Sequence, residues 1–223
     1  MINEAIPGHG AAFAGYYETP RLALLDLITQ PQVSRVLEVG CGGGANLAEI
    51  KRRFPACHTT GVELRAEAGL AAQGAGRVDA LLIGDVLNTN EVALPTAAFD
   101  LIVLSHVLEH FAQPEVLLAR VGEWLAPGGQ LLVALPNVRH ISLLMELVWR
   151  GDFEYQAAGI LDRTHLRFFT RKSALRFLRG CGWQVEAHAA DIAGPKSRLL
   201  SRLSLGWADD FAAFAHNFSL RAP

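Results

Sequence analysis

One short stretch of this chain, residues 35–44, restricts its fold more than any other. Its first half, Arg35–Val39, has strand character, and its second half is a loop of almost bare backbone, Gly40-Cys41-Gly42-Gly43-Gly44. A helix-like segment, 45–54, follows at once. Glycine permits positive φ in a tight turn and lets a ligand approach the backbone. The helix N-terminus behind it offers unpaired N–H groups, so the stretch indicates binding of an adenosine-containing cofactor.

The glycine loop alone leaves the type of cofactor open. The spacing Gly40-x-Gly42-x-x-Ala45 also fits the dinucleotide fingerprint, which tolerates alanine at its third position. Glu63 lies 23 residues after Gly40, where either cofactor needs a carboxylate for its ribose hydroxyls. The rest of the chain must therefore distinguish the two.

Strand-like and helix-like segments alternate along the chain. The expected strands are 36–40, 58–64, 80–84, 99–105 and 130–135, and the expected helices are 21–28, 46–54, 66–73 and 114–125. Apolar strands between helices predict a parallel sheet covered on both faces. We interpret 127–129, Pro-Gly-Gly, as a turn. After Pro136 the pattern predicts helices at 141–149 and 173–179, an irregular loop at 151–162, and strands at 183–189 and 210–219.

Composition excludes several classes of protein. The chain has 223 residues, of which 51% are hydrophobic, so it can form one domain with a sizeable core. A net charge of −2 gives no general attraction to nucleic acid, and we expect no nucleic-acid partner. Three cysteines without a CxxC pair, no evident signal peptide and no span of about 18 apolar residues predict a cytoplasmic protein without stable membrane insertion. Nothing in the sequence predicts its oligomeric state.

Four ordered motifs resemble those of class I S-adenosylmethionine-dependent methyltransferases, over roughly residues 35–220. They are the glycine loop, Gly61-Val62-Glu63, Gly84-Asp85-Val86, and the pair Phe99–Val103 and Leu125–Gly129. The resemblance implies S-adenosyl-L-methionine as cofactor. It also implies a doubly wound, Rossmann-like α/β fold with a mostly parallel seven-stranded sheet, an antiparallel last strand and a small helical and loop cap. We expect an N-terminal flap and helix at 1–30 and a methyltransferase domain at 31–220, with the cap inserted at about 137–170.

The same resemblance assigns the expected cofactor contacts. Glu63 would accept from both ribose hydroxyls, and Asp85 would accept from the adenine amine. The other expected contacts are Glu38, Gly40, Cys41, Gly42, Gly44, Leu64, Val86 and Ser105. For Glu38 two interpretations stay open: it stabilises the sulfonium charge through the local field, or it caps the loop backbone. Asp100 merely opens the fourth strand, so we expect it to be structural.

The segment Gly159–Thr170 follows the fifth strand, where this fold places substrate-facing loops. It resembles bacterial methyltransferases of polysaccharide and cell-surface glycan pathways, and also ubiquinone-type O-methyltransferases, which carry a His and a downstream Phe there. Methyl transfer to an alcohol removes a proton, and neutral histidine suits that task near pH 7. We therefore name His165 as the candidate catalytic base. The alternative is that His165 hydrogen-bonds a carbonyl and pins the loop.

Other side chains are candidates for contact with the methyl acceptor. They are His106 after the fourth strand, Arg163 and Arg167 as forks for a phosphate or carboxylate, and Tyr16 as part of a lid. Ion pairs from the arginines to Asp162 or Asp152 are the alternative. Phe168 and Phe169 are expected in the core, and Thr170 is expected to cap the helix that follows.

Two further patterns carry open interpretations. The string His106-Val107-Leu108-Glu109-His110 matches HxxEH, an inverted zinc-peptidase motif. It follows a buried strand and no third ligand is apparent, so we expect neither a peptidase nor a metal. The basic and apolar tract 194–207 is typical of a segment that lies on a membrane surface or faces a lipid-linked substrate. Packing against the last strands is the interpretation we favour.

The sequence as a whole predicts an S-adenosyl-L-methionine-dependent methyltransferase with a small-molecule acceptor. Transfer to a hydroxyl, of a sugar or cell-surface glycan precursor, is the expected reaction. The Asn/Asp-Pro-Pro-Tyr motif of nucleic-acid amino-methylating enzymes is absent after the fourth strand, where the chain reads Ser105-His106-Val107-Leu108. Two alternatives stay open: a catalytically inactive partner subunit with the methyltransferase fold, and a nicotinamide-dependent oxidoreductase.

Overall fold

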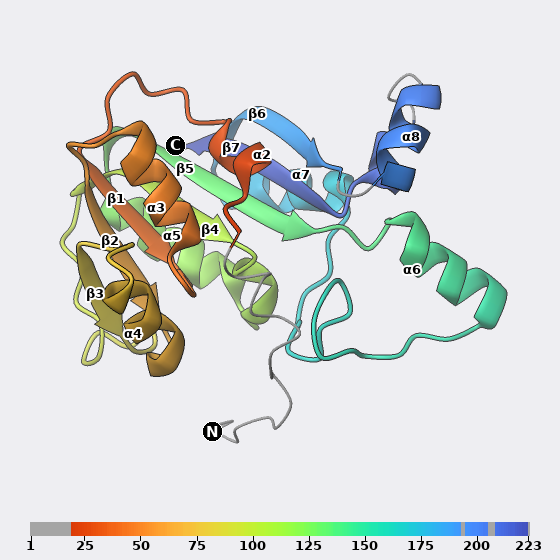
Figure 1. The fold of residues 1–223 in the computed structure, drawn as a ribbon, viewed down its shortest axis with the longest axis horizontal. Coiled ribbons are helices and arrows are strands. Elements are labelled where there is room, and N and C mark those ends of the chain that lie inside the picture. The colour runs from red at the N-terminus through yellow and green to blue at the C-terminus, as the bar shows by residue number, and fades with distance from the viewer. Residues whose placement is uncertain (1–18, 193–194, 205–207, 223) are drawn as a thin grey trace.

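The computed structural model describes residues 19–192, 195–204 and 208–222. They form one seven-stranded sheet in the order β3-β2-β1-β4-β5-β7-β6 (Figure 1). The strands are β1 Arg35–Val39, β2 His58–Glu63, β3 Ala80–Ile83, β4 Phe99–Ser105, β5 Leu125–Pro136, β6 Gln184–Asp191 and β7 Ala215–Arg221. Strands β1 to β5 pair in parallel, whereas β7 is antiparallel to both of its neighbours. The predicted fold class is therefore confirmed.

Helices cover both faces of the sheet, as continuous apolar strands require (Figure 1). Leu37 and Ile102 face a core formed with α5 Pro114–Trp124 and α7 Arg171–Gly180. Val36 and Leu101, one residue away on the same strands, face the opposite core. That second core is completed by α2 Leu22–Leu25, α3 Ala45–Arg53 and α4 Ala66–Gly74. Because both cores hold β1 and β4 from either side, the carboxyl ends of the central strands are rigidly placed.

Three local predictions are wrong. The residues Pro127–Gly129 form no turn before the fifth strand, because β5 already begins at Leu125. A register shift against β4 accommodates them, and Gly128 takes the required positive φ of 74°. The predicted strand at 210–219 starts late, since Asp209 and Asp210 open a short helix, α9 Asp209–Ala212. The predicted helix at 21–28 is only the single turn α2.

The segment between β5 and α7 leaves the sheet and then returns to it. Its helix α6 Ile141–Met145 continues into a π-helical turn, η3 Glu146–Arg150, which confirms the helix predicted at 141–149. The segment projects from the end of β5 (Figure 1), and a bridge between Asn137 and Phe169 ties its two ends together. Thr170 then caps α7 through a bond that its hydroxyl accepts from Ser173 N, at 3.2 Å, as predicted. Across the ranges described, no helix is both long and apolar enough to cross a bilayer.

A histidine pair in the C-terminal strands, half-buried His188 and buried His216, predicts acid sensitivity. His216 Nδ1 lies 3.0 Å from His188 Nε2, and burial lowers the pKa of His216 to about 4. The neutral form therefore stabilises the fold above an unfolded-state pKa of about 6.5. We expect that stability to be lost as the pH falls from 6.5 to about 4, and the loss to be shallower in His216→Gln. Urea unfolding at several pH values measures the free energy of unfolding and its slope against pH. The control variant His58→Gln, at an exposed histidine, should keep the wild-type slope. Equal slopes for all three proteins would contradict the prediction.

Candidate functional site

The glycine loop joins β1 to α3 at the carboxyl edge of the sheet. Gly40, Gly42 and Gly44 all have positive φ, at 67°, 49° and 75°. A Cβ on Gly40 would lie 2.9 Å from Val107 Cγ2, and one on Gly44 would lie 3.0 Å from Ala72 Cβ. Because side chains are excluded there both by conformation and by space, the loop presents bare backbone at the N-terminus of α3.

Glu63, the last residue of β2, lies against this loop. Its side chain is buried, with 7% of the residue exposed. Its Oε2 accepts from Gly42 N at 2.8 Å, and its Oε1 accepts from Arg65 N at 3.0 Å. The parallel pairing of β1 and β2 brings the carboxylate to the loop. The site thus has an acceptor-only group beside the bare backbone, which suits a vicinal diol.

Glu38 lies beneath the loop, inside β1, and is almost fully buried. Its Oε1 accepts from Asn46 Nδ2 at 2.7 Å, and Asn46 Oδ1 accepts from Arg21 N at 2.8 Å. Burial, with a smaller effect from the charge of Glu63, raises the pKa of Glu38 to about 8. The carboxyl group therefore bonds a side chain of α3 and not the loop backbone. Its Oε2 is buried without a hydrogen-bond partner among the described residues.

The other predicted cofactor residues lie along the same edge but differ in exposure. Asp85, after β3, is exposed, and its Oδ1 accepts from Leu87 N at 2.9 Å. Leu64 is 69% exposed beside Glu63, whereas the side chain of Val86 packs in the core. Cys41 is also buried, and burial raises the pKa of its thiol, so that thiol is unreactive. The half-buried Ser105 ends β4.

A second group of polar side chains follows β4. His106 has a positive φ of 57°, and the short 3₁₀ helix η2 Leu108–His110 comes next. Leu166 N and Arg167 N both donate to the carbonyl of Glu109, at 2.8 and 3.0 Å. These two bonds fasten the segment around His165 to the end of β4.

His165 is buried in this second group. Its Nδ1 lies 3.0 Å from the carbonyl of Ile160, so the neutral ring donates there and keeps a lone pair on Nε2. Burial lowers the pKa of His165, against an opposing effect from the Glu109 charge. The predicted alternative, a loop-pinning hydrogen bond to a carbonyl, is therefore present. The same bond leaves Nε2 able to accept a proton.

Glu109 is the least solvated charged residue of the group. It is 0% exposed, and neither carboxylate oxygen has a hydrogen-bond partner within the described ranges. The nearest basic atoms to its Oε1 are His106 Nδ1 at 3.4 Å and His165 Nε2 at 3.9 Å. A buried carboxylate with so little hydrogen bonding is costly, which makes a further ligand at this point physically reasonable.

Three of these side chains can offer a metal-ligand set. One ligand atom each from Glu109, His110 and His165 lies within 4.8 Å of the other two. The sequence interpretation that no third ligand is available is therefore wrong, because His165 approaches from a segment far along the chain. The objection to a peptidase holds, since the only helix within the string is the three-residue 3₁₀ helix η2 and not a long α-helix. Mixed nitrogen and oxygen donors suit Zn²⁺ or Mn²⁺.

The predicted acceptor arginines are bonded to backbone carbonyls. Arg167 donates to Ala112 O through two nitrogens, and Arg163 Nε donates to Gln156 O at 3.4 Å. Asp162 instead accepts from Thr164, so the alternative of an Arg163–Asp162 ion pair is not formed in the described structure. Both arginines are exposed. Tyr16 lies outside the described residues.

The two adjacent phenylalanines of the segment have different surroundings. Phe169 is in the core, as predicted. Phe168 is 36% exposed, so its predicted core position is wrong. Its ring lies 6.1 Å from that of Phe153 and 6.3 Å from that of Tyr155, centroid to centroid. The segment thus carries an aromatic cluster of Phe153, Tyr155 and Phe168. The ring centroid of Phe168 lies 6.4 Å from that of His165.

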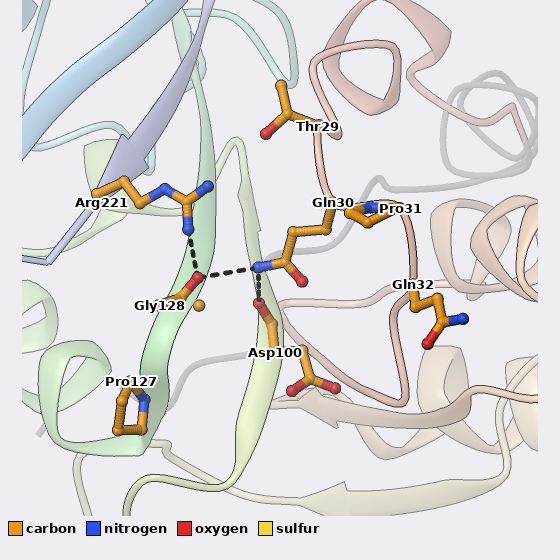
Figure 2. Close-up of a pocket in the computed structure, with 9 residues that line it drawn as sticks. Thr29, Gln30, Pro31, Gln32, Asp100, Pro127, Gly128 and Arg221 are labelled. Atoms are coloured by element: carbon orange, nitrogen blue, oxygen red, sulfur yellow. Dashed lines mark hydrogen bonds between the residues drawn. The ribbon is translucent and has the colours of Figure 1, made fainter.

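A cavity of about 440 Å³ lies at the amino edge of the sheet, away from this chemistry. Figure 2 shows Gln30 donating to the carbonyls of Asp100 and Gly128, with Arg221 donating to Gly128 from the other side. Asp100 Oδ2 accepts from Ser34 N and Arg35 N, which confirms its structural role. These polar groups fasten the connection before β1, so the cavity is not the candidate site.

The comparisons with known proteins identify the family. The chain matches the model of the methyltransferase domain family over residues 14–188, and it belongs to that family. The resemblance to class I S-adenosylmethionine-dependent methyltransferases is thereby confirmed. A solved S-adenosylmethionine-dependent methyltransferase of Thermotoga maritima, described as a possible histamine N-methyltransferase, has a TM-score of 0.64 at 16% identity. The aligned region covers 93% of this chain and 89% of the Thermotoga maritima protein.

Curated relatives are similar over parts of their length. Trans-aconitate 2-methyltransferase of Deinococcus radiodurans is 32% identical over 63% of this chain and 53% of that protein. The ubiquinone biosynthesis O-methyltransferase of Xanthomonas axonopodis pv. citri is 28% identical over 84% of this chain and 79% of that protein. The chain thus spans only 53% of the first of these relatives.

Proposed function

We propose that this protein transfers a methyl group from S-adenosyl-L-methionine to a hydroxyl group of a small-molecule acceptor, such as a sugar or a cell-surface glycan precursor. The observation that carries the proposal is the shared edge of the sheet. Glu63 borders the glycine loop there, after β1. The segment that carries His165, which is neutral at pH 7, is fastened to the end of β4, the strand next to β1. The similarity to ubiquinone biosynthesis O-methyltransferases supports a hydroxyl acceptor.

The residues of the glycine loop fit the cofactor. Bare backbone at Gly40 and Gly44, where a Cβ would collide with neighbours, leaves room for close approach. In this role Glu63 accepts from the ribose hydroxyls and Asp85 accepts from the adenine amine. The unpartnered Glu38 Oε2 offers a further hydrogen-bonding atom beneath the glycine loop. S-Adenosyl-L-methionine, when bound, supplies an electrophilic methyl group on a sulfonium. We also propose the division into an N-terminal segment 1–30 and a domain 31–220 with a cap at about 137–170.

The acceptor side needs a proton acceptor and a fixed geometry. His165 Nε2 would take the proton of the acceptor hydroxyl and so make its oxygen a better nucleophile toward the methyl group that the cofactor would supply. The bond from Nδ1 to Ile160 O fixes the tautomer that can do this. Holding the two reacting centres at the ends of adjacent strands supplies most of the rate advantage.

A second candidate is a metal-assisted form of the same transfer. The observation that favours it is Glu109, which is fully buried with both oxygens unpartnered in the described ranges. One of its oxygens lies within 4.8 Å of a ring nitrogen of His110 and of His165, so the three could share one ion. A divalent cation held there would lower the pKa of a bound hydroxyl, so His165 would act as a ligand and not as a base.

One assay tests the acceptor class and separates the two candidates. Transfer of a labelled methyl group is measured with matched acceptor pairs, a phenol with its aniline and a sugar with its amino sugar, with and without a chelator. We expect methylation of the hydroxyl members and, for His165 as base, an unchanged rate after chelation. Loss of the rate on chelation, restored by Zn²⁺, Mn²⁺ or Mg²⁺, would establish the metal-assisted form. Methylation of the amines alone would contradict both.

A further inference from the structure

The helix that projects from the sheet exposes the side chains that a helix normally buries. On α6 and η3, Ile141, Met145, Val148 and Trp149 are 37%, 47%, 72% and 75% exposed. Their spacing of four, seven and eight residues from Ile141 places them on one helix face. Single exposed apolar residues are ordinary on a protein surface, but a contiguous apolar face marks an interaction site.

A second helix has the same character. In α8 Pro195–Leu203, Leu199 and Leu203 lie one turn apart and are 56% and 76% exposed. The favoured interpretation that this tract packs against the last strands is therefore wrong for these two leucines. Arg198 and Arg202, also exposed, lie beside them one turn apart. The sequence of α8 contains no acidic residue.

The two helices occupy the same end of the long axis of the molecule, beyond the carboxyl end of β5 (Figure 1). The segment 151–170, which returns from that end, carries the exposed aromatic cluster Phe153, Tyr155 and Phe168. One ring of this cluster, that of Phe168, lies 6.4 Å from the ring of His165. This end of the protein faces away from the amino-edge cavity at Gly128.

We propose that α6, η3 and α8 bind the surface of an anionic lipid bilayer. Charge complementarity selects this occupant, because α8 combines exposed leucines with arginines and no acidic side chain. Arg150, next to Trp149, pairs with Glu146 at 3.3 Å, and its side chain is still 76% exposed. Aliphatic and tryptophan side chains enter the region between headgroups and acyl chains while neighbouring arginines bind headgroup phosphates. Binding of this kind does not depend on the proposed methyl transfer.

Vesicle co-sedimentation of the whole chain tests this proposal. The probes are phosphatidylcholine vesicles with and without about 30% phosphatidylglycerol, at low and high salt. We expect binding to the anionic vesicles, weakened by salt. The double variant Val148→Glu with Trp149→Glu should bind at least about tenfold more weakly, since it removes two apolar groups and adds repulsive charge. The double variant Arg198→Ala with Arg202→Ala should weaken binding to the anionic vesicles and leave binding to phosphatidylcholine vesicles unchanged.

A matched control uses exposed apolar residues elsewhere. Leu70 on α4 and Val116 on α5 are 56% and 41% exposed, and the double variant Leu70→Glu with Val116→Glu should bind vesicles like the wild type. S-Adenosylhomocysteine affinity reports that each variant is folded. Equal binding by both double variants, or no binding of the wild type to anionic vesicles, would overturn the proposal. So would a dimer in solution that the Val148 and Trp149 changes dissociate, because the face would then join two copies of the chain.

Discussion

Alanine in place of Glu63 is expected to weaken the binding of S-adenosylhomocysteine by about 100-fold or more. A carboxylate that accepts from two ribose hydroxyls makes two charge-assisted hydrogen bonds, each worth about 1.5–3 kcal/mol. A loss of about 3 kcal/mol corresponds to roughly a hundredfold change in Kd. Isothermal titration of wild type and variant, with NAD as the comparison ligand, measures the effect directly.

Two further variants separate a ligand contact from damage to the loop. In the ligand-free structure the carboxylate of Glu63 also holds Gly42 N and Arg65 N, so the loss of Glu63 can loosen the loop itself. Glu63→Gln keeps one acceptor oxygen for these bonds, and we expect it to bind with intermediate affinity. Glu67→Ala, on the exposed first turn of α4, should bind like the wild type. Wild-type affinity in Glu63→Ala, or binding of NAD in place of S-adenosylhomocysteine, would refute the cofactor assignment.

The parts of the molecule that follow from sequence are those set by local signals. Residues 35–44 combine a buried strand with glycines that need positive φ, and both properties are visible in the residue types alone. The sequence predicts Glu63 from its spacing to Gly40 and its place at the end of the second strand, and one parallel pairing with β1 brings it to the loop. The near-continuous apolar runs of β1 and β4 likewise predict the two cores that hold the edge in place.

The parts that were missed depend on contacts between distant segments. Glu109 and His165 meet because two backbone bonds attach the returning loop to η2, and no local pattern encodes those bonds. The prediction of a turn at Gly128 is wrong because a register shift between β4 and β5 keeps Pro127–Gly129 within the strand. Leu199 and Leu203 were expected to be covered, yet a helical pattern gives the spacing of apolar residues and not the surface that they face.

Replacement of His165 by glutamine is expected to lower kcat by about 10²- to 10⁴-fold, the range for loss of a general base. Glutamine can still donate to Ile160 O, so it preserves the loop-pinning bond and removes only the proton acceptor. The Kd for S-adenosylhomocysteine should therefore stay within about twofold, because His165 lies outside the glycine loop. An unchanged kcat would show that the hydrogen bond to Ile160 is the whole role of His165.

The pH profile supplies a readout that a purely structural role would not change. Because burial lowers the pKa of His165, the base is neutral and active above that pKa, which lies below the ordinary value of about 6.5. The wild-type rate should rise as the pH increases through this range and then stay level near pH 7. His165→Gln should lose that rise. The control His140→Gln, in which the exchanged ring bonds Ser142 and packs against Phe214, should retain it. A rise that persists in His165→Gln would assign the proton transfer to another group of the cluster, of which His106 and His110 are the nearest.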